Sequence, residues 1–167
     1  EIIVSGYRAA VENAINLKRE APVIAEAFSA EDIGKLPDVS IAETLGRLPG
    51  LATQRLDGRS QVLSIRGLGP DYSSTLLNGR EQVSSGDNRA VEFDQYPSEL
   101  IDSGVIYKTP YAGLIGQGLA GTVDLHTIRP LSKKDRILAL NARFEINDGG
   151  SLNPDSPSKG YRGTAVY

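Results

Sequence analysis

Few side chains in this chain of 167 residues could carry out covalent chemistry. Cysteine is absent, which excludes thiolate nucleophiles, zinc–thiolate sites and disulfides. The one histidine, His126, would have to be the base of any Ser/His/Asp hydrolase. It stands in Asp124-Leu125-His126-Thr127, which has the composition of a β-strand, where a lone histidine is usually structural or exposed. There is no Gly-Lys-Ser/Thr phosphate motif and no Gly-x-Gly-x-x-Gly of the dinucleotide type after a strand. We therefore expect no enzyme activity and no cofactor.

Composition narrows the class of partner. A net charge of −3 gives no concentrated basic face, so we expect no binding to nucleic acid. No apolar run approaches the ~20 residues of a membrane-spanning helix. Gly (18) and Pro (9), with only 6% aromatic residues, predict one turn-rich domain with a thin core. Because methionine is absent and the first residues lack the features of a signal peptide, we expect a processed or excised chain.

The apolar pattern predicts a small α+β domain. Ser40-Ile41-Ala42-Glu43 is a capping box that begins a short helix, and Pro49-Gly50 ends it. Asp57-Gly58 is a strong turn signal between two strands. Residues 7–22 contain a weak amphipathic helix. Strands are predicted at residues 1–5, 22–28, 51–55, 61–66, 74–78, 104–108 and 122–127, a helical turn at 97–101, and loops at 84–89 and 111–120.

Residues 136–147 differ in kind. Apolar side chains at Leu138, Leu140, Phe144 and Ile146 alternate with polar or small ones. This pattern fits a transmembrane β-strand with one face toward lipid and one toward a wet lumen, and an ordinary half-exposed strand is the alternative. A second alternating strand begins at residues 161–167. Because one strand and a fraction cannot close a barrel, we expect the chain to be part of a longer protein.

Four short segments that follow the helix ending at Leu48-Pro49-Gly50 carry a family resemblance. They are Ser64-Ile65-Arg66-Gly67, residues 76–80, residues 105–110 and residues 121–127. Together they resemble the plug domain of TonB-dependent outer-membrane receptors. Residues 36–43, 63–70 and 93–101 are most similar to the branch found in Caulobacter- and Xanthomonas-type bacteria.

The resemblance implies a division of the chain and a function. It implies a TonB box at residues 1–6, a linker at 7–22, a plug domain at 23–130, and the first strand or two of a transmembrane β-barrel at 136–167. The plug would be a small mixed sheet with short helices, held inside its own β-barrel in the Gram-negative outer membrane, with the N-terminus toward the periplasm. It would gate the import of a scarce nutrient, energised by the C-terminal domain of TonB.

A free-standing periplasmic binding or secretin-type α+β domain is the alternative. Such a domain would need neither the alternating strand at 136–147 nor an unpaired strand at its N-terminus. Several hundred further residues of alternating strands in the parent gene would decide between the two. The imported nutrient is not readable from the sequence, and we favour an oligosaccharide over a siderophore.

The residues that match the TonB box are Glu1, Ile2, Ile3, Val4 and Ser5. An extended segment offers unpaired backbone groups to the edge of a partner's sheet, so that main-chain hydrogen bonds supply the affinity. We therefore expect these five residues to bind TonB by strand addition. A plain internal edge strand is the alternative.

Two arginines match positions that in the family pair with glutamates of the barrel wall. Arg66 lies in the Ile-Arg-Gly motif and Arg80 follows Leu-Leu-Asn-Gly. A guanidinium stays charged and binds a carboxylate with two hydrogen bonds, which suits a dry interface between plug and barrel. We expect both to act as latches, with exposed strand-end arginines as the alternative.

Three loops should face outward in this layout, at residues 56–60, 84–92 and 111–120. Short polar side chains in the first two suit hydroxyl-rich or charged ligands. The candidate substrate-facing residues are Asp57, Arg59, Ser84, Ser85, Asp87, Asn88 and Arg89. No metal site has proper ligand spacing, although Asp57 and Asp87 leave calcium open.

Overall fold

The computed structural model describes residues 3–29, 40–56, 58–114, 118–129, 131, 138–151, 154–155 and 157–166. The chain divides into two compact units, Glu1–Ile128 and Arg129–Tyr167. Among the described residues, no helix is long and apolar enough to cross a membrane.

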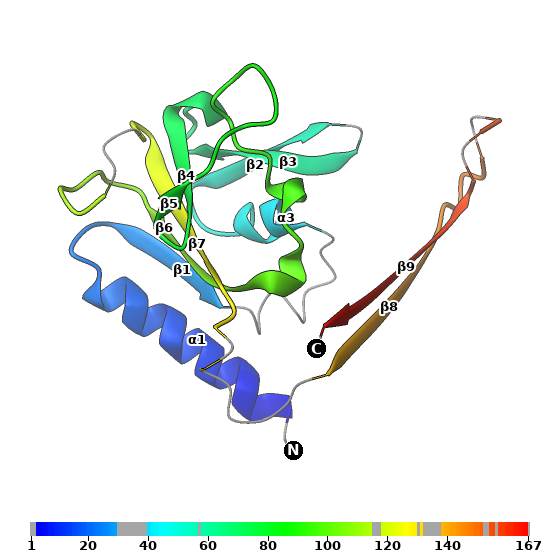
Figure 1. Ribbon diagram of the computed structural model, residues 1–167, viewed down its shortest axis with the longest axis horizontal. Helices are drawn as coiled ribbons and strands as arrows, with labels where there is room; N and C mark the ends of the chain where they lie inside the picture. Colours follow the sequence, from blue (N-terminus) through cyan, green and yellow to red (C-terminus); the bar gives the residue numbers. More distant parts are fainter. Residues whose placement is uncertain are drawn as a thin grey trace. The chain divides into compact units, whose positions relative to one another are not determined.

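A mixed five-stranded sheet organises the first unit, in the order β1-β6-β7-β4-β5 (Figure 1). β1 (Ala25–Ser29) pairs antiparallel with β6 (Ile101–Tyr107), and β6 pairs antiparallel with β7 (Gly121–Thr127). β7 runs parallel to β4 (Ser73–Leu77), which forms a tight hairpin with β5 (Arg80–Glu81). The predicted strands near 22–28, 74–78, 104–108 and 122–127 are confirmed, whereas β5 was not expected from the sequence.

A separate hairpin and a short helix cover the core. β2 (Leu51–Leu56) pairs antiparallel with β3 (Arg59–Ile65), as the Asp-Gly turn predicted, and Gly58 has the positive φ of 79° that the turn requires. α3 (Ile41–Leu45) begins at Ser40, whose Oγ accepts a hydrogen bond from the Glu43 amide at 3.3 Å. This confirms the predicted N-cap. The apolar face of α3 joins residues of the hairpin and the sheet in one core cluster, which includes Ile41, Leu45, Leu63, Ile65, Ile106 and Leu125.

Three single-turn 3-10 helices, η1 (Pro70–Tyr72), η2 (Phe93–Gln95) and η3 (Ser98–Leu100), complete the connections of this unit. Phe93 of η2 is buried in the core cluster, so the chain between β5 and β6 is anchored at this point. The helical turn predicted at 97–101 corresponds to η3.

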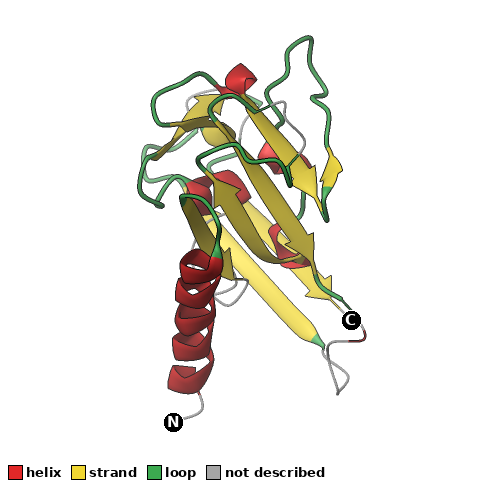
Figure 2. Ribbon diagram, turned by 90° about the vertical axis from the view of Figure 1, so that its left-hand side faces the viewer, coloured by secondary structure: helices red, strands yellow, loops and turns green. Residues whose placement is uncertain are grey.

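The N-terminal helix α1 (Ile3–Glu20) corrects the prediction of an extended stretch at residues 1–5, since Ile3, Val4 and Ser5 form its first helical turn (Figure 2). Glu1 and Ile2 lie outside the described residues. The helix is favoured by Ala10, which is buried, and by the Arg8–Glu12 ion pair at 3.0 Å. Once such a helix exists, each added residue gains one hydrogen bond, which outweighs the strand preference of Ile-Ile-Val.

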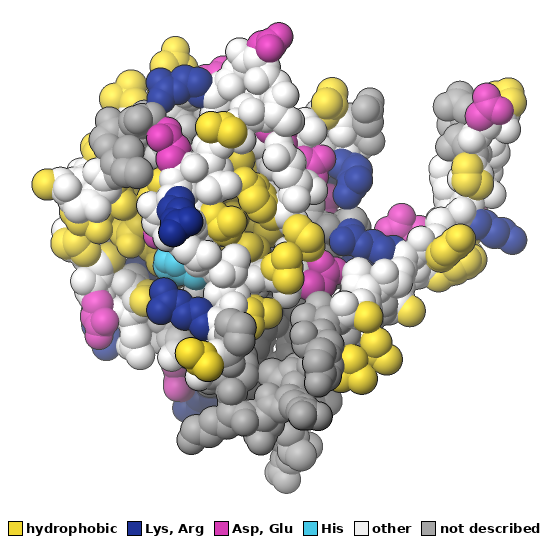
Figure 3. All heavy atoms as spheres, viewed as in Figure 1, with side chains coloured by type: hydrophobic (Ala, Val, Ile, Leu, Met, Phe, Trp, Pro, Cys, Tyr) yellow, Lys and Arg dark blue, Asp and Glu magenta, His cyan; other side chains and the backbone are white. Residues whose placement is uncertain are grey.

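The second unit is a two-stranded antiparallel ribbon. β8 (Ala139–Ile146) pairs with β9 (Lys159–Val166) over eight residue pairs, from Ala139 opposite Val166 to Ile146 opposite Lys159. The second strand therefore begins two residues before the predicted 161. The apolar side chains on β8 are exposed, for example 74% for Leu140 and 62% for Phe144 (Figure 3). This face has no covering layer among the described residues of the ribbon.

Candidate functional site

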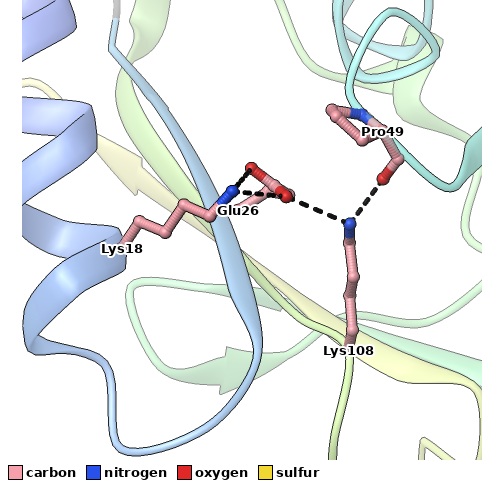
Figure 4. A network of polar contacts seen from close by, with 4 residues as sticks. All are labelled: Lys18, Glu26, Pro49 and Lys108. Atoms are coloured by element: carbon pink, nitrogen blue, oxygen red, sulfur yellow. Dashed lines mark hydrogen bonds and ion pairs between the residues drawn. The ribbon is translucent and has the colours of Figure 1, made fainter.

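A polar network joins the N-terminal helix to the sheet and to the turn after α3 (Figure 4). Lys18, in the last turn of α1, donates to both carboxylate oxygens of Glu26 on β1, at 2.9 and 3.0 Å. Lys108, just after β6, lies with its Nζ 3.3 Å from Glu26 Oε1 and also donates to the carbonyl oxygen of Pro49. One carboxylate is thus shared by two ammonium groups from different elements.

Burial decides how strong each half of this network is. The side chains of Lys108 and Glu26 are only 8% and 13% exposed, whereas that of Lys18 is 52% exposed. Burial alone would raise the pKa of the Glu26 carboxyl, but hydrogen bonds and charge attraction from Lys18 and Lys108 outweigh it and hold that pKa below its usual value. The Lys18 contacts are the shorter ones, at 2.9 and 3.0 Å against 3.3 Å, but water screens the half-exposed Lys18 ammonium, whereas Lys108 and Glu26 are shielded from water.

Hydrogen bonds extend the network through α3 to the β2–β3 hairpin. The Oγ of Ser40, the N-cap of α3, donates to the carbonyl oxygen of Ser60 at 3.2 Å, and Ser60 is fully buried at the start of β3. Pro49 follows α3 and receives the Lys108 hydrogen bond. Contacts therefore run from the end of the 56–60 turn, through α3, to α1.

The two arginines predicted as latches both lie on the surface of the first unit, and among the described residues no hydrogen bond joins them. Arg66, at the end of β3, adopts a positive φ of 54°, and its backbone amide donates to Gly50 O at 2.8 Å. Arg80 opens β5 after Asn78 and Gly79, which also have positive φ values of 53° and 76°. Both are exposed, and within the described residues neither guanidinium has a hydrogen-bond or ion-pair partner.

The predicted substrate-facing loops differ in how much they are held. Arg59 is exposed at the start of β3, and Asp57 lies outside the described residues. Between residues 111 and 120, residues 115–117 lie outside the described range, and Tyr111 packs against Tyr107 with ring centroids 5.6 Å apart. Of the three loops, only the one at residues 84–92 lies entirely within the described residues.

The loop at residues 84–92 folds back on itself. Ser84 Oγ lies 3.0 Å from Asn88 Oδ1, and the Ser85 amide donates to Glu92 Oε2 at 3.0 Å. The Arg89 amide donates to Asp71 Oδ1 at 3.1 Å. Asp87 is exposed, and the loop lies at the end of the unit opposite the start of α1 (Figure 1).

His126 is placed as the sequence predicted, within β7. Its Nε2 lies 3.2 Å from Asp124 Oδ2, two residues earlier on the same face of the strand. Asp124 also accepts a hydrogen bond from the Gly79 amide at 3.1 Å, so the carboxylate fixes the β4–β5 turn. Among the residues that the structure describes, no three metal-ligating side chains come together.

Sequence reasoning missed three residues on which these contacts depend: Glu26, Lys108 and Glu92. A charged residue within a short apolar strand, as in Ala25-Glu26-Ala27-Phe28, is a signal that could have found the first. The partner of Lys108 cannot be predicted from spacing, since 82 residues separate Lys108 from Glu26. The partners of Glu92 lie within eight residues of it, in a loop that has no helical or strand periodicity.

Comparisons with known proteins agree with this architecture. The family model described as the TonB-dependent Receptor Plug Domain matches residues 17–123. An unliganded ferric citrate transporter, FecA, is 19% identical over 83% of this chain and 22% of its own, with a TM-score of 0.68. The siderophore receptor PirA from Pseudomonas aeruginosa is 29% identical over 77% of this chain and 22% of its own, with a TM-score of 0.54. The Serratia marcescens hemophore receptor HasR is 19% identical over 78% of this chain and 21% of its own, with a TM-score of 0.59. The chain therefore spans about a fifth of the length of these receptors.

Proposed function

Because this chain belongs to the TonB-dependent receptor plug domains, whose relatives are Gram-negative outer-membrane transporters and not enzymes, we propose that it gates the import of a nutrient through a barrel of its own receptor. The observation that carries the proposal is the match over residues 17–123, which begins within the last turn of α1 and leaves the alternating strands of the second unit downstream. This order suits a gate placed between an energy-supplying partner and a barrel.

TonB binds residues 1–5 in this proposal. Since Ile3, Val4 and Ser5 form the first turn of α1, strand addition requires that turn to unwind. The first turn contains no acidic residue to complement the helix dipole, and Gly6 follows within the helix. A glycine in a helix interior costs about 1 kcal/mol relative to alanine, so this end of α1 unwinds at low cost.

In this proposal, the network of Lys18, Glu26 and Lys108 couples α1 mechanically to the rest of the plug. Force applied to α1 reaches β1 through the Lys18–Glu26 pair, and the sheet and the turn after α3 through Lys108. Arg66 and Arg80 hold the plug to barrel carboxylates. Their exposure and the lack of a guanidinium partner within the described residues support that role.

The substrate we propose is an oligosaccharide, bound by the loops at 56–60 and 84–92. The support is chemical: Arg59, Asp87 and their neighbours are short or charged polar groups suited to hydroxyl-rich ligands. The solved relatives are a siderophore receptor, a ferric citrate transporter and a hemophore receptor, which are properties of those proteins. Growth of a strain that depends on the full receptor, on oligosaccharides against ferric siderophores, separates the two classes.

Binding of the TonB C-terminal domain tests the proposed function without knowledge of the substrate. The full receptor should retain this domain in a pull-down, and deletion of residues 1–5 should abolish retention while the receptor still inserts in the outer membrane. A matched deletion in the ribbon turn, residues 148–152, controls for loss of chain length. Equal retention by the receptor lacking residues 1–5 would contradict the proposal.

A further inference from the structure

The first residues of the loop Ser84–Arg89 are hydrogen-bonded to the carboxylate of Glu92, whereas the Arg89 amide at its end is held by Asp71. Glu92 Oε1 lies 2.7 Å from Ser84 Oγ, and Glu92 Oε2 accepts from the Ser85 amide at 3.0 Å and from Gln95 Nε2 at 2.7 Å. Ser84 has one hydroxyl proton, and the 2.7 Å contact with the charged oxygen is shorter than its 3.0 Å contact with Asn88. Its oxygen in turn accepts from the Gly86 amide at 2.9 Å.

The two ends of this loop are anchored in the plug body. On one side, Gln82 donates from its backbone to Thr75 O at 2.9 Å, and its side-chain oxygen accepts from Tyr96 Oη at 2.9 Å. On the other side, Ala90, Val91 and Phe93 are buried. None of residues 84–89 is itself buried, so apolar packing does not order the loop between its anchors.

We propose that Glu92 is the positioning residue of this loop, holding Ser84–Arg89 in one conformation in which Asp87 is exposed. The ligand-facing role of the loop rests on the proposed function, but its ordering by Glu92 does not. The hydroxyl of Ser84 and the backbone amides of Ser85 and Gly86 then donate hydrogen bonds within the loop. The loop therefore meets a ligand as a preformed surface, which reduces the ordering that binding requires.

A carboxylate does this better than an amide. Both oxygens of Glu92 accept hydrogen bonds, one from Ser84 and the other from Ser85 and Gln95. In Glu92→Gln one of these oxygens becomes an NH2 donor facing other donors, and the charge is lost. Bonds to the remaining neutral oxygen are weaker than those to a charged one.

Amide hydrogen exchange on the full receptor tests the proposal without any ligand. In Glu92→Gln, exchange at the Ser85 and Gly86 amides should accelerate at least tenfold, while the amides of β7 keep their protection. Glu81→Gln is the matched control, because Glu81 is exposed on β5 and its carboxylate has no hydrogen-bond or ion-pair partner among the described residues. This result stands or falls separately from TonB retention.

A nitroxide at residue 87 supplies a readout that a general loss of stability would not produce. Since the chain has no cysteine, Asp87→Cys gives a single labelling site within it. The label should give a broad, ordered spectrum in the parent and Glu81→Gln backgrounds, and a narrow, mobile one with Glu92→Gln. Unchanged exchange and an unchanged spectrum in Glu92→Gln would overturn the proposal, and so would an equal loss of protection in β7.

Discussion

Lys108 and Glu26, which 82 residues separate in the chain, form an ion pair beneath the N-terminal helix, with Nζ 3.3 Å from Oε1. Their side chains are only 8% and 13% exposed. Lys108 contacts both Glu26 and the carbonyl oxygen of Pro49, so its removal would break two contacts that are shielded from water, whereas the half-exposed Lys18–Glu26 pair is screened. We therefore expect the loss of Lys108 to weaken the connection of α1, β1 and the turn after α3 more than the loss of Lys18 does.

Lys108→Met should weaken the local stability of β1 by about 2 kcal/mol, because Glu26 keeps Lys18 but the Pro49 carbonyl loses its donor. Amide exchange of β1 in the full receptor should accelerate roughly thirtyfold. Lys18→Met is the matched control and should cost no more than about 1 kcal/mol. Similar effects of the two variants would show that the burial of Lys108 does not make its ion pair with Glu26 contribute more to stability than the exposed pair of Lys18 does.

Acid should loosen α1 and β1 through the same carboxyl group. The pKa of Glu26 lies below its usual value of 4.5, so the folded state binds fewer protons than the unfolded state. The stabilisation is fully present above pH 4.5 and is lost as the pH falls through the lowered folded-state pKa. Exchange rates of β1 amides, corrected for intrinsic chemistry, should rise in that window, and Glu26→Gln should flatten this dependence. A profile that Glu26→Gln leaves unchanged would assign the acid sensitivity to other groups.

Gly104→Ala should destabilise the plug by about 1–3 kcal/mol, because overpacking a close contact forces neighbours to move. Gly104 stands opposite Phe28 in the β1–β6 register, and an added Cβ would lie 2.4 Å from Phe28 Cε1. The second change Phe28→Leu should recover part of the loss. Protection of β6 amides measures both variants, and an additive double variant would exclude this clash as the cause.

The isolated chain of 167 residues should self-associate in water through the ribbon. Leu140 and Phe144 are more than 60% exposed on β8, and exposed apolar strands promote association. Replacing both with Asn should shift the sedimentation profile toward monomer. Asn at Val83 and Leu119, which are exposed apolar residues of the first unit, is the control and should leave association intact.

Local signals in the sequence predicted those parts of the fold that depend on neighbouring residues. The N-cap of α3 depends only on Ser40 and Glu43, which are three residues apart. The turn between β2 and β3 likewise depends on the adjacent residues Asp57 and Gly58. Ile3, Val4 and Ser5 were wrongly predicted as extended, because strand preference does not register a helix that propagates from its later turns.

Contacts between distant segments were beyond the reach of the sequence. Glu26 looked like an ordinary polar residue of a strand, and only the sheet order brings Lys108 to it. The partners of Glu92 are near in the sequence, only three to eight residues away, but no regular spacing rule of helices or strands applies within a loop, so their hydrogen bonds were not predicted. The TonB-binding residues, the two arginine latches and the substrate-facing side chains stay predictions.

The most direct test of the proposal that TonB binds the N-terminal segment of this plug is cysteine cross-linking in cells. The chain has no cysteine, so a single cysteine at residues 1–5 is unique within it, and the unsubstituted full receptor controls for adducts formed elsewhere. Paired with a cysteine on the edge strand of the TonB C-terminal domain, these variants should form disulfide-linked adducts, strongest at alternate positions as strand addition requires. A cysteine at Asp87 should form none. The absence of TonB adducts at all five positions, with the receptor present in the outer membrane, would contradict the account.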